Sequence, residues 1–296
     1  MKRIVYTLAV GKPKYAECAM GLARSLKLIG DTTTRVIITD IKGYAWDRYF
    51  DQVLEPQTTM EWIQFAKLTA LDRTDADQVL FIDSDCLVFK RLDPIFDYCA
   101  GKGLCVQGVH VTSGEWLGKV EDHLRVNNIP SMPRFNGGMI YYERTDACRA
   151  MIANSFEEGK NAKQSGLICD TPWITDEGAI SLAMARAGLD RNGNCHLIPD
   201  ELDYMNTATG LIGKLDMDVL KNRCAFLCRR FDIRYVEPTI FHASRYINFV
   251  VYWKQLERLA WLEKYEDDHG FGYMSPLQKM ERSIQRRYLK LTKKFL

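Results

Sequence analysis

The sequence VLFIDSDCLV, residues 79–88, decides the fold because it joins a run of apolar residues to two acidic side chains. The four leading residues predict a buried strand, and Asp83 and Asp85 follow where the backbone leaves the sheet. Side chains at positions i and i+2 of an extended chain face the same side, so both carboxylates can approach one hard divalent cation. An ordinary Asp-Ser-Asp turn is the alternative, because Asp and Ser are common turn formers.

Apolar runs typical of strands alternate with helical periodicity on both sides of this stretch. We predict strands at 3–10, 34–40, 78–83, 104–109, 138–142 and 195–198, and helices at 14–29, 61–73, 145–156 and 176–187. An apolar stretch at 86–89 leads to a turn at Asp93-Pro94. Such alternation predicts an α/β fold with a mainly parallel central sheet between helices, in which ligands bind beyond the carboxyl ends of strands. Residues 112–134 are predicted to form a long loop, and the C-terminal third to be helical, aromatic and finally basic.

The composition is that of a folded globular chain. Hydrophobic residues make up 47% and charged residues 26% of the sequence, and the formal net charge of +2 gives no basis for a nucleic-acid partner. The nine cysteines include no C-x-x-C pair, which predicts neither a disulfide framework nor a zinc site, and we expect reduced, mostly buried thiols. Neither a signal peptide nor a membrane-spanning run is recognisable, so we expect a cytoplasmic protein.

The last 22 residues, 275–296, differ from the rest of the chain. They contain seven Lys or Arg and one Glu, a local charge of +6 (7 − 1), and apolar residues recur at spacings of three and four. This pattern predicts an amphipathic helix with a basic face, which suits peripheral contact with an anionic membrane. A terminal helix docked on the domain or on a partner subunit is the alternative interpretation.

Several segments together resemble the retaining glycosyltransferases of family 8, the group that includes glycogenin and the bacterial lipooligosaccharide galactosyltransferases. The resemblance rests on the strand with its D-x-D motif, and on FAKL (65–68), FNGGM (135–139), TDE (175–177) and FH (241–242), which follow in the family's order. Two departures are evident. Glu177 stands where the family usually has glutamine, and the segment after His242 lacks the usual glycine and Lys-Pro-Trp.

The resemblance implies a single Rossmann-like A-type glycosyltransferase domain at 1–250 with a helical, basic C-terminal extension at 251–296. It implies that Mn²⁺ or Mg²⁺ is held by Asp83, Asp85 and His242. It implies contacts with the nucleotide-sugar donor from Thr7, Leu8, Ala9, Tyr15, Asp40, Lys67, Ser84, Gly137 and Gly138, and positioning of the reacting sugar by Asn136 and Asp176.

Each of these residues also has a simpler interpretation. His242 follows an apolar run and suits a buried core histidine, and Lys67 on a predicted helix suits a solvated surface lysine. The segment 136–138 suits a turn into the next strand. Asp176 and Glu177 suit the first turn of a helix, because acidic side chains favour its positive end.

The predicted function is metal-dependent transfer of a sugar from a nucleotide diphosphate donor, a UDP-hexose, to a glycan, glycolipid or protein acceptor with retention. One alternative is a haloacid-dehalogenase-like phosphohydrolase, in which Asp83 is the nucleophile and Asp85 handles protons. That motif usually continues with Gly-Thr, whereas Cys86-Leu87 follows here. The other alternative is a non-catalytic nucleotide-sugar binding protein.

Overall fold

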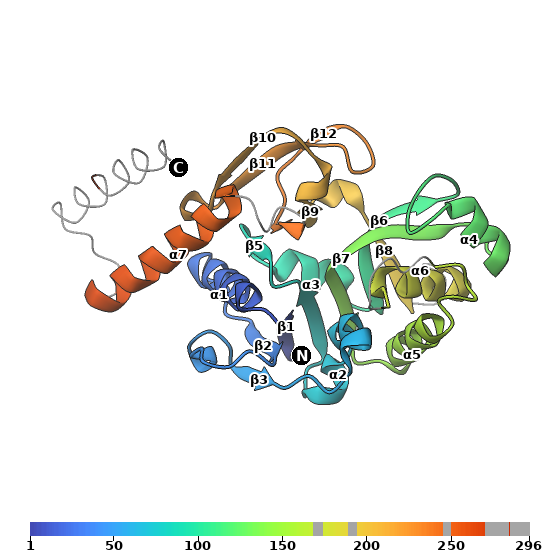
Figure 1. Ribbon diagram of the computed structural model, residues 1–296, viewed down its shortest axis with the longest axis horizontal. Helices are drawn as coiled ribbons and strands as arrows, with labels where there is room; N and C mark the ends of the chain where they lie inside the picture. Colours follow the sequence, from blue (N-terminus) through green and yellow to red (C-terminus); the bar gives the residue numbers. More distant parts are fainter. Residues whose placement is uncertain (168–173, 189–193, 245–249, 270–283, 285–296) are drawn as a thin grey trace. The chain divides into compact units, whose positions relative to one another are not determined.

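A computed structural model of the chain describes residues 1–167, 174–188, 194–244, 250–269 and 284. The chain divides into two compact units, residues 1–259 and 260–296, and the first contains the central sheet (Figure 1). The expected domain boundary at residue 250 falls at the start of helix α7 (Val250–His269) and stays a prediction. The predicted amphipathic helix at 275–296 lies outside the described residues, apart from Ile284.

The central sheet confirms the predicted α/β class. Its strand order is β3-β2-β1-β4-β7-β6-β8. The bounds are β1 (Arg3–Ala9), β2 (Thr34–Thr39), β3 (Gln52–Leu54), β4 (Gln78–Ile82), β6 (Leu104–Val111), β7 (Met132–Glu143) and β8 (Cys195–Pro199). Neighbouring strands are parallel from β3 to β4 and again between β6 and β8, whereas β7 runs antiparallel to both β4 and β6.

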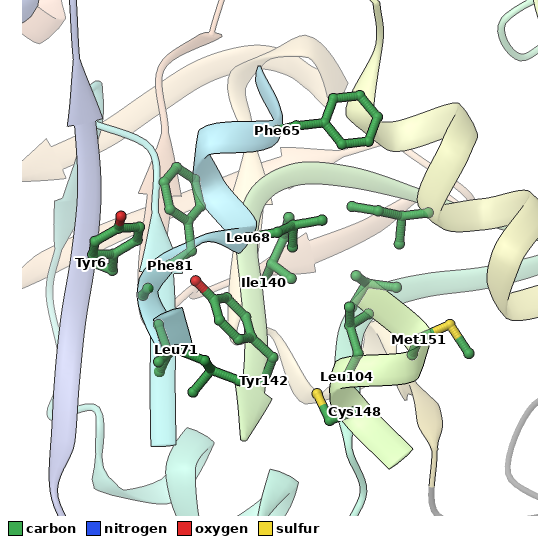
Figure 2. Packing of buried hydrophobic residues seen from close by; sticks show 14 of the residues in the cluster. Tyr6, Phe65, Leu68, Leu71, Phe81, Leu104, Ile140, Tyr142, Cys148 and Met151 are labelled. Carbon is green, nitrogen blue, oxygen red and sulfur yellow. The ribbon is translucent and has the colours of Figure 1, made fainter. Parts of the chain in front are cut away.

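Helices cover both faces of this sheet, as the continuous apolar runs of its strands require. Their bounds are α1 (Pro13–Leu28), α2 (Ala70–Arg73), α3 (Asp93–Cys99), α4 (Val120–Asn127), α5 (Asp146–Lys160) and α6 (Asp176–Ala187). Successive residues of β4 pack into different apolar layers, one on each face of the sheet. Phe81 packs in the layer that contains Tyr6 and Tyr142, and Leu80 in the layer that contains Leu22. Figure 2 shows the first layer, with Tyr6, Phe81 and Tyr142 among aliphatic side chains.

The C-terminal third corrects the expectation that it is helical, because five strands lie between residues 205 and 242. One three-stranded sheet has the order β5-β13-β9, formed by β5 (Cys86–Val88), β13 (Ile240–His242) and β9 (Met205–Thr207). The other contains β10 (Leu211–Asp218), β11 (Arg223–Cys228) and β12 (Arg234–Val236). In β11, Phe226 and Cys228 are buried while Leu227 between them is 38% exposed, the period of two that marks a half-buried strand.

Two further expectations are wrong in detail. The predicted helix at 61–73 is a 3-10 helix, Met60–Leu68, followed by the single turn of α2. In a 3-10 helix residues i and i+3 are aligned, which places both Trp62 and Phe65 against Phe156 of α5. The predicted loop at 112–134 contains α4, whose Val120 and Leu124 are one helical turn apart and pack into a small apolar cluster.

The cysteine chemistry is as expected in the described part of the chain, where eight cysteines are free and buried. None of the described helices combines the length and the apolar character that a membrane span requires.

The hydroxyl of Tyr142 fixes the end of the 3-10 helix. It donates a 2.6 Å hydrogen bond to the Lys67 carbonyl, and the side chain is fully buried. We expect Tyr142→Phe to lower the free energy of unfolding by about 1–3 kcal/mol, because a buried carbonyl loses its partner. Urea denaturation measures the change. The matched control is Tyr235→Phe, which alters a side chain that is 61% exposed; equal stability of the two variants would contradict the assignment.

Candidate functional site

Backbone hydrogen bonds from two neighbouring segments hold the D-x-D turn at the carboxyl end of β4. The Asp83 N–H donates to the Gly138 carbonyl of β7 at 3.0 Å, and the Cys86 N–H donates to the Asp83 carbonyl at 3.0 Å. The Ala243 N–H donates to the Asp85 carbonyl at 3.1 Å. The turn interpretation of this motif is therefore correct for the backbone, and the carboxylates are left available for other contacts.

The structure brings the three predicted metal ligands together. Strand β13 pairs with β5 in the register His242 to Cys86, which places the imidazole over the turn. His242 Nε2 lies 3.2 Å from Asp85 Oδ1 and 3.7 Å from Asp83 Oδ2. The carboxylate side chains are only 14% and 23% exposed, so this is a partly enclosed group of oxygen and nitrogen donors.

Cys86 is the third member of a cluster with Asp85 and His242 whose ligand atoms lie within 4.8 Å of one another. Its thiol is fully buried and donates to the Gly138 carbonyl at 3.8 Å. Burial, with the nearby charges of Asp85 and Asp83, raises the pKa of this thiol well above its ordinary value. A protonated thiol is a poor ligand for a hard ion, so carboxylate and imidazole are the donors that remain.

The Asn136 side chain determines which nitrogen of His242 carries a proton. Asn136 Oδ1 accepts from the Gly138 N–H at 3.1 Å, and Asn136 Nδ2 donates to Glu177 at 3.2 Å, which fixes the orientation of the amide. The same Oδ1 lies 2.7 Å from His242 Nδ1, so Nδ1 must be the donor. In the neutral imidazole the lone pair is therefore on Nε2, the nitrogen that faces the two aspartates.

Lys67 is a buried cation, which excludes the surface-lysine interpretation. Its side chain is 5% exposed, and Nζ lies 3.2 Å from Asp83 Oδ1 and 3.2 Å from Asp176 Oδ2. Burial by itself lowers the pKa of Lys67, but the charges of Asp176, Asp83 and Glu177 outweigh it, and the net shift of the pKa is upward. The ammonium is consequently charged and bridges strand β4 to helix α6.

The acidic pair at the start of α6 contacts β7 as well as beginning a helix. Asp176 is 4% exposed, and Thr175 makes no side-chain capping hydrogen bond. Glu177 accepts hydrogen bonds from the Gly137 N–H at 2.7 Å and from Asn136 at 3.2 Å. Glu177 is thus a residue of the site that was not among the predicted site residues, and its place beside Asp176 in the segment 175–177 is the signal in the sequence that points to it.

The segment 136–138 lies inside β7 rather than in a turn. A Cβ added at Gly138 would lie 2.5 Å from His242 Nδ1, so glycine is required for the imidazole to approach. A Cβ at Gly137 would lie 3.1 Å from Asp176 Oδ2. The two glycines thus permit the close packing of β7 against both the histidine and the acidic pair.

The carboxylates differ electrostatically. Burial raises the pKa of Asp83 despite the opposing charges of Lys67 and His242. Burial acts in the same direction on Asp85, but the charge and hydrogen bond of His242 outweigh it and lower the pKa of Asp85. Burial lowers the pKa of His242, and the two aspartates reverse the shift, so its net direction is upward. Asp83 and Asp85 also repel each other, because the charge of Asp85 helps to raise the pKa of Asp83. A bound cation would relieve this repulsion, so the group is a favourable place for a cation.

The remaining predicted donor contacts lie along β1, on α1, after β2 and in the D-x-D turn. Tyr15 on α1 is half-buried, and burial, with a smaller contribution from the charge of Asp85, raises the pKa of its hydroxyl. Asp40 is exposed and accepts a 2.8 Å hydrogen bond from the Gly11 N–H, without a described contact to the predicted metal ligands. The others lie as follows: Thr7, Ala9 and Ser84 are buried, and Leu8 is half-buried.

Comparison with known proteins gives a match at the level of the fold. No family model and no curated protein matches the sequence. The galactosyltransferase LgtC in complex with donor and acceptor sugar analogs matches with a TM-score of 0.52 at 13% identity, over 87% of this chain and 95% of that chain. An active-site mutant of LgtC with glutamine replaced by glutamate matches with a TM-score of 0.53 at 14% identity, with the same coverage. The chain thus has the A-type glycosyltransferase fold, as predicted.

Two other matches are longer proteins. The chain spans 39% of the bifunctional glycosyltransferase WbbM (TM-score 0.48, 14% identity) and 47% of the glycosyltransferase GlyE of Streptococcus pneumoniae TIGR4 (TM-score 0.47, 13% identity). These matches cover 69% of this chain in both cases.

Removing the buried Lys67 ammonium should destabilise the folded protein. We expect Lys67→Met to lower the free energy of unfolding by about 3–5 kcal/mol in the presence of a chelator, because Asp83 and Asp176 are left without a buried counter-charge. Urea denaturation measures this loss. The double variant Lys67→Met, Asp176→Asn should lose less than the sum of the two single variants. Lys221→Met, at a side chain that is 64% exposed, is the control, and a similar small effect of both lysine variants would contradict the bridge.

Glu177 should make stability depend on pH. Burial and the charge of Asp176 raise its pKa above the ordinary 4.5, so the folded state binds the proton more tightly than the unfolded state. Stability from this group is therefore lost as pH rises from about 4.5 through the raised pKa. We expect Glu177→Gln to remove this loss, so that the variant gains stability relative to the wild type between pH 4.5 and neutrality. Urea denaturation across this range tests the sign, and a constant difference would contradict it.

Proposed function

We propose that the protein is a metal-dependent glycosyltransferase that takes a sugar from a nucleotide diphosphate donor. The observation that carries this proposal is the convergence of Asp83, Asp85 and His242 Nε2 at the carboxyl end of β4, with the histidine tautomer fixed by Asn136. In an open α/β sheet, this end of the strands is where ligands bind. The A-type glycosyltransferase fold supports the same assignment.

The donor set suits a Mn²⁺ or Mg²⁺ ion. Asp83 and Asp85 would supply carboxylate oxygens and His242 an imidazole nitrogen, a combination that such ions accept. A bound ion of this kind neutralises the negative charge that a departing diphosphate acquires. Lys67 holds Asp83 and Asp176 in fixed positions, and its ammonium adds a positive charge beside the place proposed for the donor phosphates.

The remaining residues of the site are proposed to hold and orient the donor. We place the nucleotide, proposed to be UDP, against the end of β1 and beside Tyr15 and Asp40, where the resemblance to family 8 puts it. Asn136 and Asp176 would position the sugar. Both are already immobilised, Asn136 by contacts with Gly138, Glu177 and His242, and Asp176 by Lys67. A preorganised polar site of this kind places the anomeric carbon for attack by the acceptor oxygen.

Membership of family 8, and transfer with retention, are part of the proposal. LgtC with a glutamine replaced by glutamate is described as an active-site mutant, and Glu177 is the natural residue here at the position where the family usually has glutamine. We therefore propose that Glu177 borders the reacting sugar, where its carboxylate would stabilise the positive charge that develops there more than a neutral amide would.

The acceptor is proposed to be a glycan, glycolipid or protein. A cytoplasmic location and peripheral contact with an anionic membrane through residues 275–296 are proposals that rest on the sequence. The haloacid-dehalogenase alternative keeps the D-x-D motif but gives no function to the His242 and Asn136 contacts. A non-catalytic nucleotide-sugar binding protein would use the same contacts, and release of UDP from a UDP-sugar distinguishes it from the enzyme.

Asp85→Asn tests the metal assignment. We expect it to reduce Mn²⁺-dependent release of UDP from UDP-hexoses by about 100-fold or more, because a ligand that supports several kcal/mol of charge stabilisation is lost. Protection of the protein by Mn²⁺ and donor against thermal unfolding should be lost in parallel. Asp216→Asn, at a side chain that is 45% exposed, is the control. Undiminished UDP release by Asp85→Asn would refute the assignment, and release of phosphate from phosphomonoesters would favour the dehalogenase alternative.

A further inference from the structure

Arg230 is a buried cation without a matching partner. Its side chain is 8% exposed, and both terminal nitrogens, Nη1 and Nη2, are buried without a hydrogen bond. The nearest carboxylate among the described residues is Asp200, whose Oδ1 lies 3.8 Å from Nη1, beyond hydrogen-bond distance. A guanidinium remains protonated in proteins, so this charge is held in the interior with donors unused.

The carboxylate nearest to Arg230 already serves other groups. Asp200 Oδ2 accepts from Arg234 at 2.9 Å, and Asp200 Oδ1 accepts from Gln107 Nε2 at 3.3 Å. Arg234 also pairs with Asp203 at 2.6 Å. Arg234 thus occupies the close positions on both acids, and Arg230 is left with a long contact.

A second arginine lies in the same region. The guanidinium carbons of Arg230 and Arg134 lie 4.7 Å and 5.7 Å from the centre of the Phe231 ring. The charge of Arg134 contributes to the lowered pKa of Arg230, after burial as the main cause. None of the described residues forms a hydrogen bond or ion pair with the Arg134 guanidinium, so two positive groups share one aromatic side chain.

The position of this pair connects it to the proposed sugar site. Arg134 precedes Asn136 by two residues on β7. Glu177, whose charge acts on Arg230, accepts hydrogen bonds from Asn136 and from the Gly137 N–H. Arg134 therefore lies beside Asn136 on the strand, and Arg230 lies near Arg134 across the Phe231 ring.

The backbone holds Arg230 in place through a close approach at a glycine. The Arg229 N–H donates to the Gly210 carbonyl at 2.7 Å. A Cβ at Gly210 would lie 3.2 Å from Arg230 Cβ and 2.7 Å from Cys228 Sγ, so a larger residue would displace the segment. The backbone that carries Arg230 is thus closely packed against Gly210.

We propose that Arg230, together with Arg134, binds a carboxylate or phosphate group carried by a substrate sugar. A buried charge that makes one long ion pair and no hydrogen bond through its terminal nitrogens is costly, and the planar fork of a guanidinium matches the two oxygens of a carboxylate or phosphate. A neutral hexose offers no such group. This inference rests on the proposed function and adds to it that the donor sugar or the acceptor sugar is acidic.

Matched pairs of probes test the inference by thermal unfolding and calorimetry with Mn²⁺ at constant ionic strength. UDP-glucuronic acid against UDP-glucose tests the donor sugar. With UDP present, glucuronate and glucose 6-phosphate, each compared with glucose, test the acceptor.

We expect the wild type to bind the acidic member of one pair about tenfold or more tightly than the neutral member. Arg230→Gln and Arg134→Gln should each remove most of that preference. The pair that shows the preference identifies the sugar that carries the charge. Arg223→Gln, at an exposed arginine paired with Asp216 on the β10-β11 hairpin, should retain it.

Other outcomes overturn the inference. It fails if the wild type binds acidic and neutral members equally, or if Arg230→Gln weakens both members by the same factor. Arg230→Met must also unfold at a temperature equal to or above that of the ligand-free wild type, because the charge it removes makes only a long ion pair with Asp200, which Arg234 already neutralises. A clear decrease would make Arg230 a structural residue. Failure of the proposed function is distinguishable, because the wild type would then bind neither UDP with Mn²⁺ nor any nucleotide sugar.

Discussion

One buried ammonium group holds the candidate site together. Lys67 comes from the 3-10 helix, Asp83 from the end of β4 and Asp176 from the start of α6, and its Nζ lies 3.2 Å from a carboxylate oxygen of each. Two acidic side chains cannot be packed together at the edge of a sheet without a counter-charge. The single cation therefore determines how three elements distant in the sequence meet, and the Tyr142 hydroxyl, bonded to the Lys67 carbonyl, secures that cation from the core side.

Strand β7 transmits this constraint to the histidine. Because it runs antiparallel beside β4, its residues 136–138 lie against the D-x-D turn. Asn136 joins His242 on one side to Glu177 on the other, and its amide can satisfy both only in one orientation. The absence of a side chain at Gly138 allows the imidazole to approach. The protonation of His242 Nδ1 and the position of Glu177 are consequently set by one amide.

The sequence predicts those parts of the fold whose apolar runs or helical periodicity can be recognised within a single segment. The run before Asp83 and the periodicity of α1 carry enough apolar residues to be recognised alone, as does the alternation that defines the α/β class. Strands β9, β12 and β13 are three residues long, too short for any periodicity, which is why the C-terminal third was mistaken for helix. Lys67 gives no local sign of burial, because its two carboxylate partners lie 16 and 109 residues away in the chain.

The departure from the family pattern at residue 177 becomes intelligible in the same electrostatic terms. A carboxylate next to Asp176 adds repulsion, and burial and that neighbour raise the pKa of Glu177. The charges of Lys67 and Arg230 act in the opposite direction and favour the ionised form. A glutamine at this position would remove the repulsion but would also remove a negative charge that acts on the two buried cations, Lys67 and Arg230. The carboxylate of Glu177 is therefore opposed by one acidic neighbour and favoured by two basic ones.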